Sequence, residues 1–185
     1  MPNLPKGREW KDIWSYGSGT RLTDLLSSAL ALLLVVPPER PTYFASPYLS
    51  DFELFNNEAR NVASLFPALA DHSKIRFKQF LIALSQVSDV RLITTESDSS
   101  LQFLDDEVLR ESEVQVRYAA DTAHEKGILA DTFYLEGSMN LTFKGAHING
   151  EKVTYYAGGT PHGKEKLSSA YIEFNRRWQN LQSTK

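Results

Sequence analysis

The sequence contains no cysteine, and this absence excludes disulfide bonds, thiol nucleophiles and thiolate metal sites together. An excess of positive charge is absent too, because 20 lysine and arginine residues stand against 23 aspartate and glutamate residues, for a net charge of -3. The chain therefore has no global positive field that would hold nucleic acid without specificity. An anionic substrate must be bound locally.

A membrane-spanning run is also lacking. The apolar stretch 22–36 is shorter than a membrane span and contains Asp24, Ser27 and Ser28, so it predicts a buried helix. Asp12 interrupts the approach to this stretch and residues 37–40 make a poor cleavage region, which argues against a signal peptide. We expect no membrane contact and a cytoplasmic protein.

The 185 residues, 42% of them hydrophobic, suit one folded domain of ordinary size. Residues 1–20 hold scattered proline, glycine and tryptophan, and predict an irregular N-terminal arm; residues 21–185 form the domain. Strand patterns are expected at 41–46, 89–95, 114–118, 124–131, 133–136 and 153–157, and helices at 20–36, 57–70, 73–86, 101–111 and 164–181. Such alternation predicts an α/β domain with a mixed β-sheet flanked by helices.

The chemistry concentrates between residues 124 and 140. If the segment after His124 is a strand, His124 and Lys126 share one face of it. A neutral imidazole can attack phosphorus and form a phosphohistidine, while a neighbouring ammonium neutralises the nonbridging oxygens. Gly137 marks a sharp turn where backbone can approach a ligand closely, and Ser138 and Asn140 add polar groups for phosphate oxygens.

These residues resemble a known signature. His124, Lys126 and Asp131 match HxKxxxxD, and Gly137, Ser138 and Asn140 match the GSxN that follows it in the phospholipase D superfamily. One departure is that five residues separate Asp131 from Gly137 where the usual pattern has six. Residues 41–46 and 170–178 also look like the family, whereas the N-terminal third matches nothing specific.

The resemblance implies a metal-independent phosphodiesterase that needs no cofactor. Family members join two motifs around one site, and this chain carries one, which implies a homodimer whose two copies of His124 face one phosphate. One histidine would attack while its mate protonates the leaving oxygen and later activates water. Glu151, eleven residues after Asn140, matches the carboxylate that orients the histidine in small nucleases of the family. Asp131 is a site residue of the motif, but strand parity puts it opposite His124 and predicts a structural role.

Plainer interpretations stand beside these. Glu151 can be an ordinary loop residue, and His72, His147 and His162 lack the spacing of a zinc site, although the last two can line a substrate groove. Tyr171, Phe174 and Trp178 recur at helical spacing and predict core contacts. The cations Lys164, Lys166, Arg176 and Arg177 fit a nucleic-acid backbone or simple solubility equally well.

The single motif and the absence of an anchor favour a DNA or RNA nuclease. The segments HEKGILAD and GSMNLT are also similar to nuclease-like members found in bacterial DNA-modification and phage-defence gene clusters. An alternative is a nucleic-acid-binding subunit of a larger bacterial complex, with little activity alone. A phospholipid hydrolase is the third interpretation, because one core serves both kinds of phosphodiester.

Overall fold

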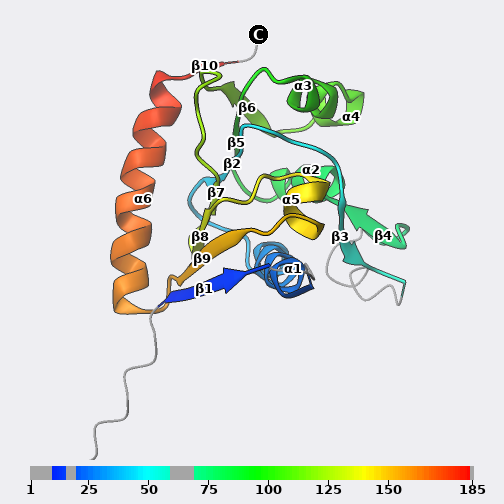
Figure 1. The fold of residues 1–185 in the computed structure, drawn as a ribbon. Helices are drawn as coiled ribbons and strands as arrows, with labels where there is room; N and C mark the ends of the chain where they lie inside the picture. Colours follow the sequence, from blue (N-terminus) through cyan, green and yellow to red (C-terminus); the bar gives the residue numbers. More distant parts are fainter. Residues whose placement is uncertain (1–9, 16–19, 59–68, 184–185) are drawn as a thin grey trace, which may run out of the picture.

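The structure is a computed structural model, and it describes residues 10–15, 20–58 and 69–183. Its centre, in this described part, is an eight-stranded sheet in the order β1-β9-β8-β7-β2-β5-β6-β10 (Figure 1). The strands are β1 (Trp10–Trp14), β2 (Thr42–Ala45), β5 (Val90–Thr94), β6 (Gln115–Tyr118), β7 (Gly127–Leu129), β8 (Phe133–Gly137), β9 (Lys152–Ala157) and β10 (Gln182–Ser183). A second sheet pairs β3 (Glu53–Asn56) with β4 (Lys74–Arg76).

Strand directions make the large sheet mixed. Strands β2, β5 and β6 run parallel, whereas β7, β8, β9 and β1 follow one another antiparallel on the other side of β2. The predicted α/β fold with a mixed sheet is therefore confirmed. The carboxyl end of β2 and the start of β7 lie at the same edge, because Ala45 pairs with Gly127.

Helices cover both faces of this sheet. They are α1 (Thr20–Val35), α2 (Phe77–Ser85), α3 (Asp98–Leu104), α4 (Glu107–Arg110), α5 (Phe143–His147) and α6 (Pro161–Asn180). Figure 1 shows α6 crossing one face, with α1 and α2 on the opposite side of the sheet. No helix of the described ranges is long and apolar enough to cross a membrane.

Strand alternation divides the core into two clusters. Phe44 of β2 belongs to the cluster beneath α1 and α2, whereas its neighbour Tyr43 packs under α6. Successive side chains of a strand point to opposite faces, so these fully buried neighbours serve both cores. Tyr171, Phe174 and Trp178 of α6 are buried against Tyr43, which confirms their predicted role in the core.

The N-terminal arm differs from the irregular segment that we expected. Residues 10–14 form the edge strand β1, paired along its length with β9. Only Ile13 of this strand is buried, so the alternation of the segment is weak and its flanking glycines conceal it. Residues 1–9 and 16–19 lie outside the described residues.

Two predicted helices, at 73–86 and at 101–111, also differ from the observed ones. Most of the helix expected at 57–70 lies outside the described residues, and the helix expected from Ser73 begins only at Phe77, because Lys74–Arg76 pair with β3. The helix expected at 101–111 is two helices. The first ends at Leu104 with Asp105 as its C-cap. Asp106 caps the second, since its carboxylate accepts the Leu109 N–H at 3.0 Å.

Candidate functional site

His124 and Lys126 lie just before β7, not inside it. The strand begins at Gly127, which pairs with Ala45, and two residues beyond Ala45 stands Pro47, which has no N–H to continue the ladder. The side chain of His124 is exposed, and the Lys126 ammonium donates to the His124 carbonyl at 2.8 Å. The two motif side chains therefore sit on an extended segment at the edge of the sheet.

The second half of the motif meets this segment through the backbone. The Gly137 N–H donates to the Lys126 carbonyl at 3.4 Å, and the Ser138 N–H donates to the Lys152 carbonyl at 2.9 Å. A Cβ on Gly137 would come within 2.1 Å of the Lys152 carbonyl oxygen. Only glycine allows the end of β8 to pass this close to β9. Ser138 therefore directly follows the residue that is hydrogen-bonded to Lys126.

Glu151 is buried beside Ser138, with 7% of its surface exposed. Its carboxylate accepts the Ser138 hydroxyl and, at 3.3 Å, the Asn149 side-chain amide. Ser15, which follows β1, fixes the Glu151 backbone from the other side, exchanging one bond in each direction at 2.9 Å. A solvated loop carboxylate would not be enclosed in this way, so Glu151 is not the ordinary loop residue of the plainer interpretation. Among the described contacts, its side chain bonds Ser138 and Asn149 and not His124, the histidine that it was expected to orient.

Asn140 completes the group that the structure brings together. Its side-chain oxygen is buried and has no hydrogen-bond partner within the described residues. An unsatisfied buried acceptor is costly, so it is a common mark of a place where a ligand or another side chain binds.

Asp131 lies apart from this group. It follows β7, at the opposite end of the strand from His124, and its carboxylate accepts the N–H groups of Glu39 and Arg40 at 2.7 and 3.0 Å. The Arg40 guanidinium also binds it. Burial alone would raise the pKa of Asp131, but the hydrogen bonds from Arg40 and Glu39 outweigh it and lower this pKa. The contacts agree with the structural role that strand parity predicts.

Glu125, between the two motif residues, points to the other side and pairs with Arg177 of α6. This ion pair ties the segment that carries His124 to the helix on the far face. Three of the four cations considered on this helix have acidic partners: Lys166 with Glu136, Arg176 with Glu173, and Arg177 with Glu125. The solubility and packing interpretation of these cations is therefore the better supported one.

Two of the three remaining histidines pack against aromatic rings. His147 stacks on Phe143 with ring centroids 4.9 Å apart, and His162 lies 5.3 Å from Trp10. His72 contacts Gln79 at 3.2 Å. Within the described ranges, no three histidine or acidic residues gather closely enough to hold a metal ion.

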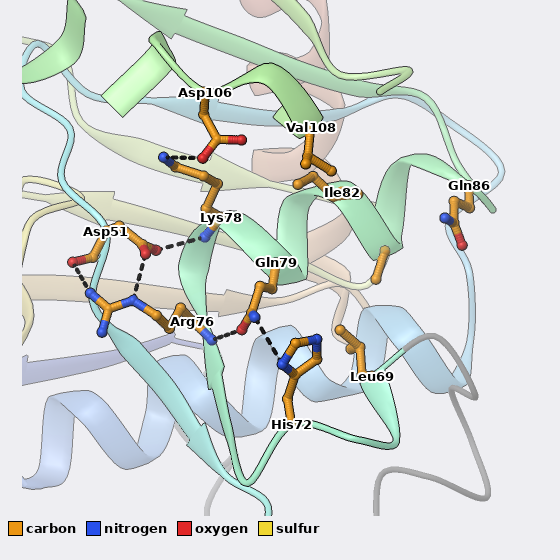
Figure 2. Close-up of a pocket in the computed structure, with 11 residues that line it drawn as sticks. Asp51, Leu69, His72, Arg76, Lys78, Gln79, Ile82, Gln86, Asp106 and Val108 are labelled. Carbon is orange, nitrogen blue, oxygen red and sulfur yellow. Dashed lines mark hydrogen bonds and ion pairs between the residues drawn. The ribbon is translucent and has the colours of Figure 1, made fainter. Parts of the chain in front are cut away.

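A cavity of about 450 Å³ lies elsewhere, over α2 (Figure 2). Its charged groups are satisfied by one another, since Arg76 binds Asp51 and Lys78 binds Asp106 at 2.9 Å. None of the motif residues lines it. A hollow of about 600 Å³ between β1 and α1 is larger, but no motif residue lines it either. The reactive side chains gather at the sheet edge, and we place the candidate site there.

Comparisons with known proteins give likeness in structure only. No family model matches the chain, and no curated protein matches it in sequence. Among solved structures, a phospholipase D family member, Nuc from Salmonella typhimurium, aligns with a TM-score of 0.62 at 15% identity, covering 95% of this chain and 97% of that one. NucT from Helicobacter pylori aligns with a TM-score of 0.57 at 13% identity, covering 95% and 100%.

A third neighbour is TrmBL2, an archaeal chromatin protein described with a novel mode of DNA binding. It aligns with a TM-score of 0.57 at 9% identity, covering all of this chain and 57% of that one. At these identities the likeness concerns the fold. The protein has the fold of the phospholipase D family, and its site must be argued from its own residues.

Proposed function

We propose that the protein is a phosphodiesterase that cleaves nucleic-acid strands through a phosphohistidine on His124. The observation that carries the proposal is the meeting of the two motif halves, where the Gly137 N–H bonds the Lys126 carbonyl and Ser138 bonds the buried Glu151. A nucleophile, a cation and hydrogen-bonding groups thus share one edge of a phospholipase D fold. The likeness to Nuc, which covers nearly all of both chains, supports this reaction class.

The reaction proceeds in two displacements. A neutral His124 nitrogen attacks phosphorus, the bond to the leaving oxygen breaks, and that oxygen takes a proton from a second imidazole. The second imidazole then removes a proton from water, whose oxygen attacks phosphorus and breaks the P–N bond. Lys126 balances the charge on the nonbridging oxygens in both steps, and the amide of Asn140 supplies a further hydrogen bond.

The second imidazole belongs to another copy of the chain. None of the other three histidines contacts the motif residues in the described contacts, and each packs against a side chain outside the site. A twofold dimer that brings the two exposed His124 side chains to one phosphate supplies the missing acid. Glu151 then acts by fixing Ser138 and the turn beside the site, because its bonds run to Ser138 and Asn149.

The test is cleavage of single-stranded DNA, duplex DNA and RNA in EDTA across a range of pH. We expect wild-type protein to cleave at least one substrate, and His124→Ala to be inactive with an unchanged urea midpoint. Activity that survives in His124→Ala, or that EDTA abolishes, would contradict the proposal.

A second candidate is a nucleic-acid-binding subunit that works inside a larger complex. The net charge of -3 weakens binding by the protein alone, and the fold likeness to the chromatin protein TrmBL2 favours a binding role. This candidate predicts an inactive pure protein together with salt-sensitive binding by the complex. Robust cleavage by the pure protein would exclude it.

A further inference from the structure

The segment that carries the proposed nucleophile makes few polar contacts with the rest of the fold. Residues 120–126 lead from β6 into β7, and among the described residues two polar contacts join them to other parts of the chain. The Gly137 N–H donates to the Lys126 carbonyl at 3.4 Å, which is long for a hydrogen bond. Glu125 pairs with Arg177 of α6. The ion pair is therefore the stronger attachment of this segment.

Arg177 stands on a part of α6 that is fixed to the sheet. Its neighbour Trp178 is buried, and the Trp178 ring packs against Tyr43 of β2 with centroids 6.0 Å apart. Arg117 of β6 donates to the Trp178 carbonyl. The side chains of Arg177 and Glu125 are only 23% and 31% exposed, so water screens their attraction less than that of a surface pair. The ion pair therefore fixes Glu125 relative to the sheet.

Glu125 lies between the two motif side chains, so its contact with α6 affects both of them. In an extended segment, successive side chains point to opposite sides. Ile128 of β7 packs in the core beneath α1 and α2, and positions 124 and 126 have the same parity as Ile128. When Glu125 is held toward α6, His124 and Lys126 therefore both point to the opposite side, where they can act on one phosphate.

We propose that Arg177 is a positioning residue of the candidate site, which holds Glu125 and thereby fixes the direction of the two motif side chains. This inference rests on the proposed function and adds to it a residue outside the motif. A displacement of about 1 Å at a reacting group costs about 100-fold in rate, so an exposed nucleophile needs a firm attachment. Binding of a substrate phosphate by Arg177 is the competing role, but Glu125 already neutralises its guanidinium.

The experiment measures kcat and KM for hydrolysis of bis(p-nitrophenyl) phosphate, a small phosphodiester, in EDTA. Arg177→Gln and Glu125→Gln should each lower kcat per folded molecule about 10- to 100-fold, with a much smaller change in KM. The double variant should be no less active than the single ones, because either substitution alone already breaks the ion pair. Arg177→Lys keeps a cation at the position and should restore part of kcat.

Lys166→Gln is the matched control. Lys166 lies on the same helix and pairs with Glu136 of β8, and these two side chains are 34% and 32% exposed, close to the values for Arg177 and Glu125. The variant loses a comparable ion pair between α6 and the sheet. It should therefore lose similar stability in urea and keep the wild-type kcat.

The positioning role is overturned if Lys166→Gln lowers kcat as much as Arg177→Gln does, since loss of fold stability would then explain both. It is also overturned if the losses in Arg177→Gln and Glu125→Gln multiply in the double variant, because the two residues would then act separately. A rise in KM with unchanged kcat in Arg177→Gln would assign this arginine to phosphate binding instead.

Order parameters of the backbone amides, measured by nuclear magnetic resonance, test the attachment without any reaction. Those of His124 and Lys126 should fall in Arg177→Gln. They should stay at the wild-type level in Lys166→Gln. If they fall as expected while the wild type hydrolyses no phosphodiester, the phosphodiesterase proposal fails and Arg177 still orders the segment. If they are unchanged while hydrolysis depends on His124, the positioning proposal alone fails.

Discussion

The Ser138 hydroxyl donates a hydrogen bond to the Glu151 carboxylate and so joins the turn after β8 to the start of β9. The same hydroxyl accepts the Lys152 N–H at 3.0 Å, while Ser15 holds the Glu151 backbone. Three segments far apart in the sequence, including one outside the motif, thereby fix the turn beside Lys126. The buried Glu151 carboxylate therefore contributes to the stability of the fold at the candidate site.

Glu151→Gln should therefore cost stability as well as activity. Ser138 and Asn149 donate to different oxygens of the carboxylate. Glutamine has an oxygen at only one of these two positions and an NH₂ group at the other, so one of the two donors loses its acceptor. We expect a loss of about 1–3 kcal/mol in the free energy of unfolding, measured by urea denaturation. Glu173→Gln is the control, since Glu173 pairs with Arg176 on the surface and its loss should change stability by less than about 0.5 kcal/mol. Equal effects of the two variants would show that the Glu151 contacts stabilise nothing.

Gly137→Ala should disrupt the meeting of the two motif halves. Its Cβ would lie 2.1 Å from the Lys152 carbonyl oxygen and 2.9 Å from the Val153 Cα, and neither backbone atom can move away without opening the β8–β9 ladder. We expect a destabilisation of at least about 1–3 kcal/mol, with lower activity on any substrate that the protein cleaves. Urea denaturation and the cleavage assay measure the two effects.

Gly159→Ala provides the matched control, because nothing lies within 4 Å of a Cβ at that position. The variant should fold and act as the wild type does. A Gly137→Ala protein that is as stable and as active as Gly159→Ala would contradict the close approach of β8 to β9.

The pattern of strands and helices could be predicted wherever a segment buries several side chains. Strands β2 and β5 and helix α6 show strong apolar patterns, and each was predicted within a few residues. The edge strand β1 buries one side chain, Ile13, and β4 is three residues long. Such strands form because a neighbouring strand offers hydrogen bonds, and that partner is not visible in the local sequence.

For the candidate site too, local patterns could be predicted and contacts between distant residues could not. The motif spacing predicts His124, Lys126, Ser138 and Asn140 as site residues. Strand parity misjudged how far β7 extends, because the local sequence does not show that the ladder with β2 ends at Ala45. Sequence reasoning missed Ser15 and the pairing of Glu125 with Arg177. Both contacts join residues that are distant in the chain, so no spacing rule reveals them.

Asp131→Asn should weaken the fold in a pH-dependent manner. The native pKa of Asp131 is lowered by its bonds to Arg40 and Glu39, so ionised Asp131 stabilises the native state above the unfolded pKa of about 3.9. This stabilisation is lost as the pH falls through the lowered native pKa. Wild type should exceed Asp131→Asn by about 1–2 kcal/mol near neutral pH, and the gap should shrink below about pH 4.

Urea denaturation at a series of pH values measures this gap. Asp105→Asn is the control, because Asp105 is 78% exposed and pairs with an exposed Arg110, and it should show little effect at any pH. Activity per folded molecule should be unchanged in Asp131→Asn, since Asp131 lies at the far end of β7 from His124. A specific loss of activity without loss of stability would place Asp131 in the reaction.

Mixing inactive and active subunits tests whether two copies share one site. Wild type and His124→Ala are unfolded together in equal amounts and refolded so that subunits associate at random. If each reaction needs two copies of His124, only wild-type pairs are active, and about one quarter of the activity of the same total amount of wild-type protein should remain. Independent protomers would retain about one half. His162→Ala, whose ring packs against Trp10 outside the motif, serves as the mixing control and should retain nearly full activity; retention of one half with His124→Ala would exclude the shared site.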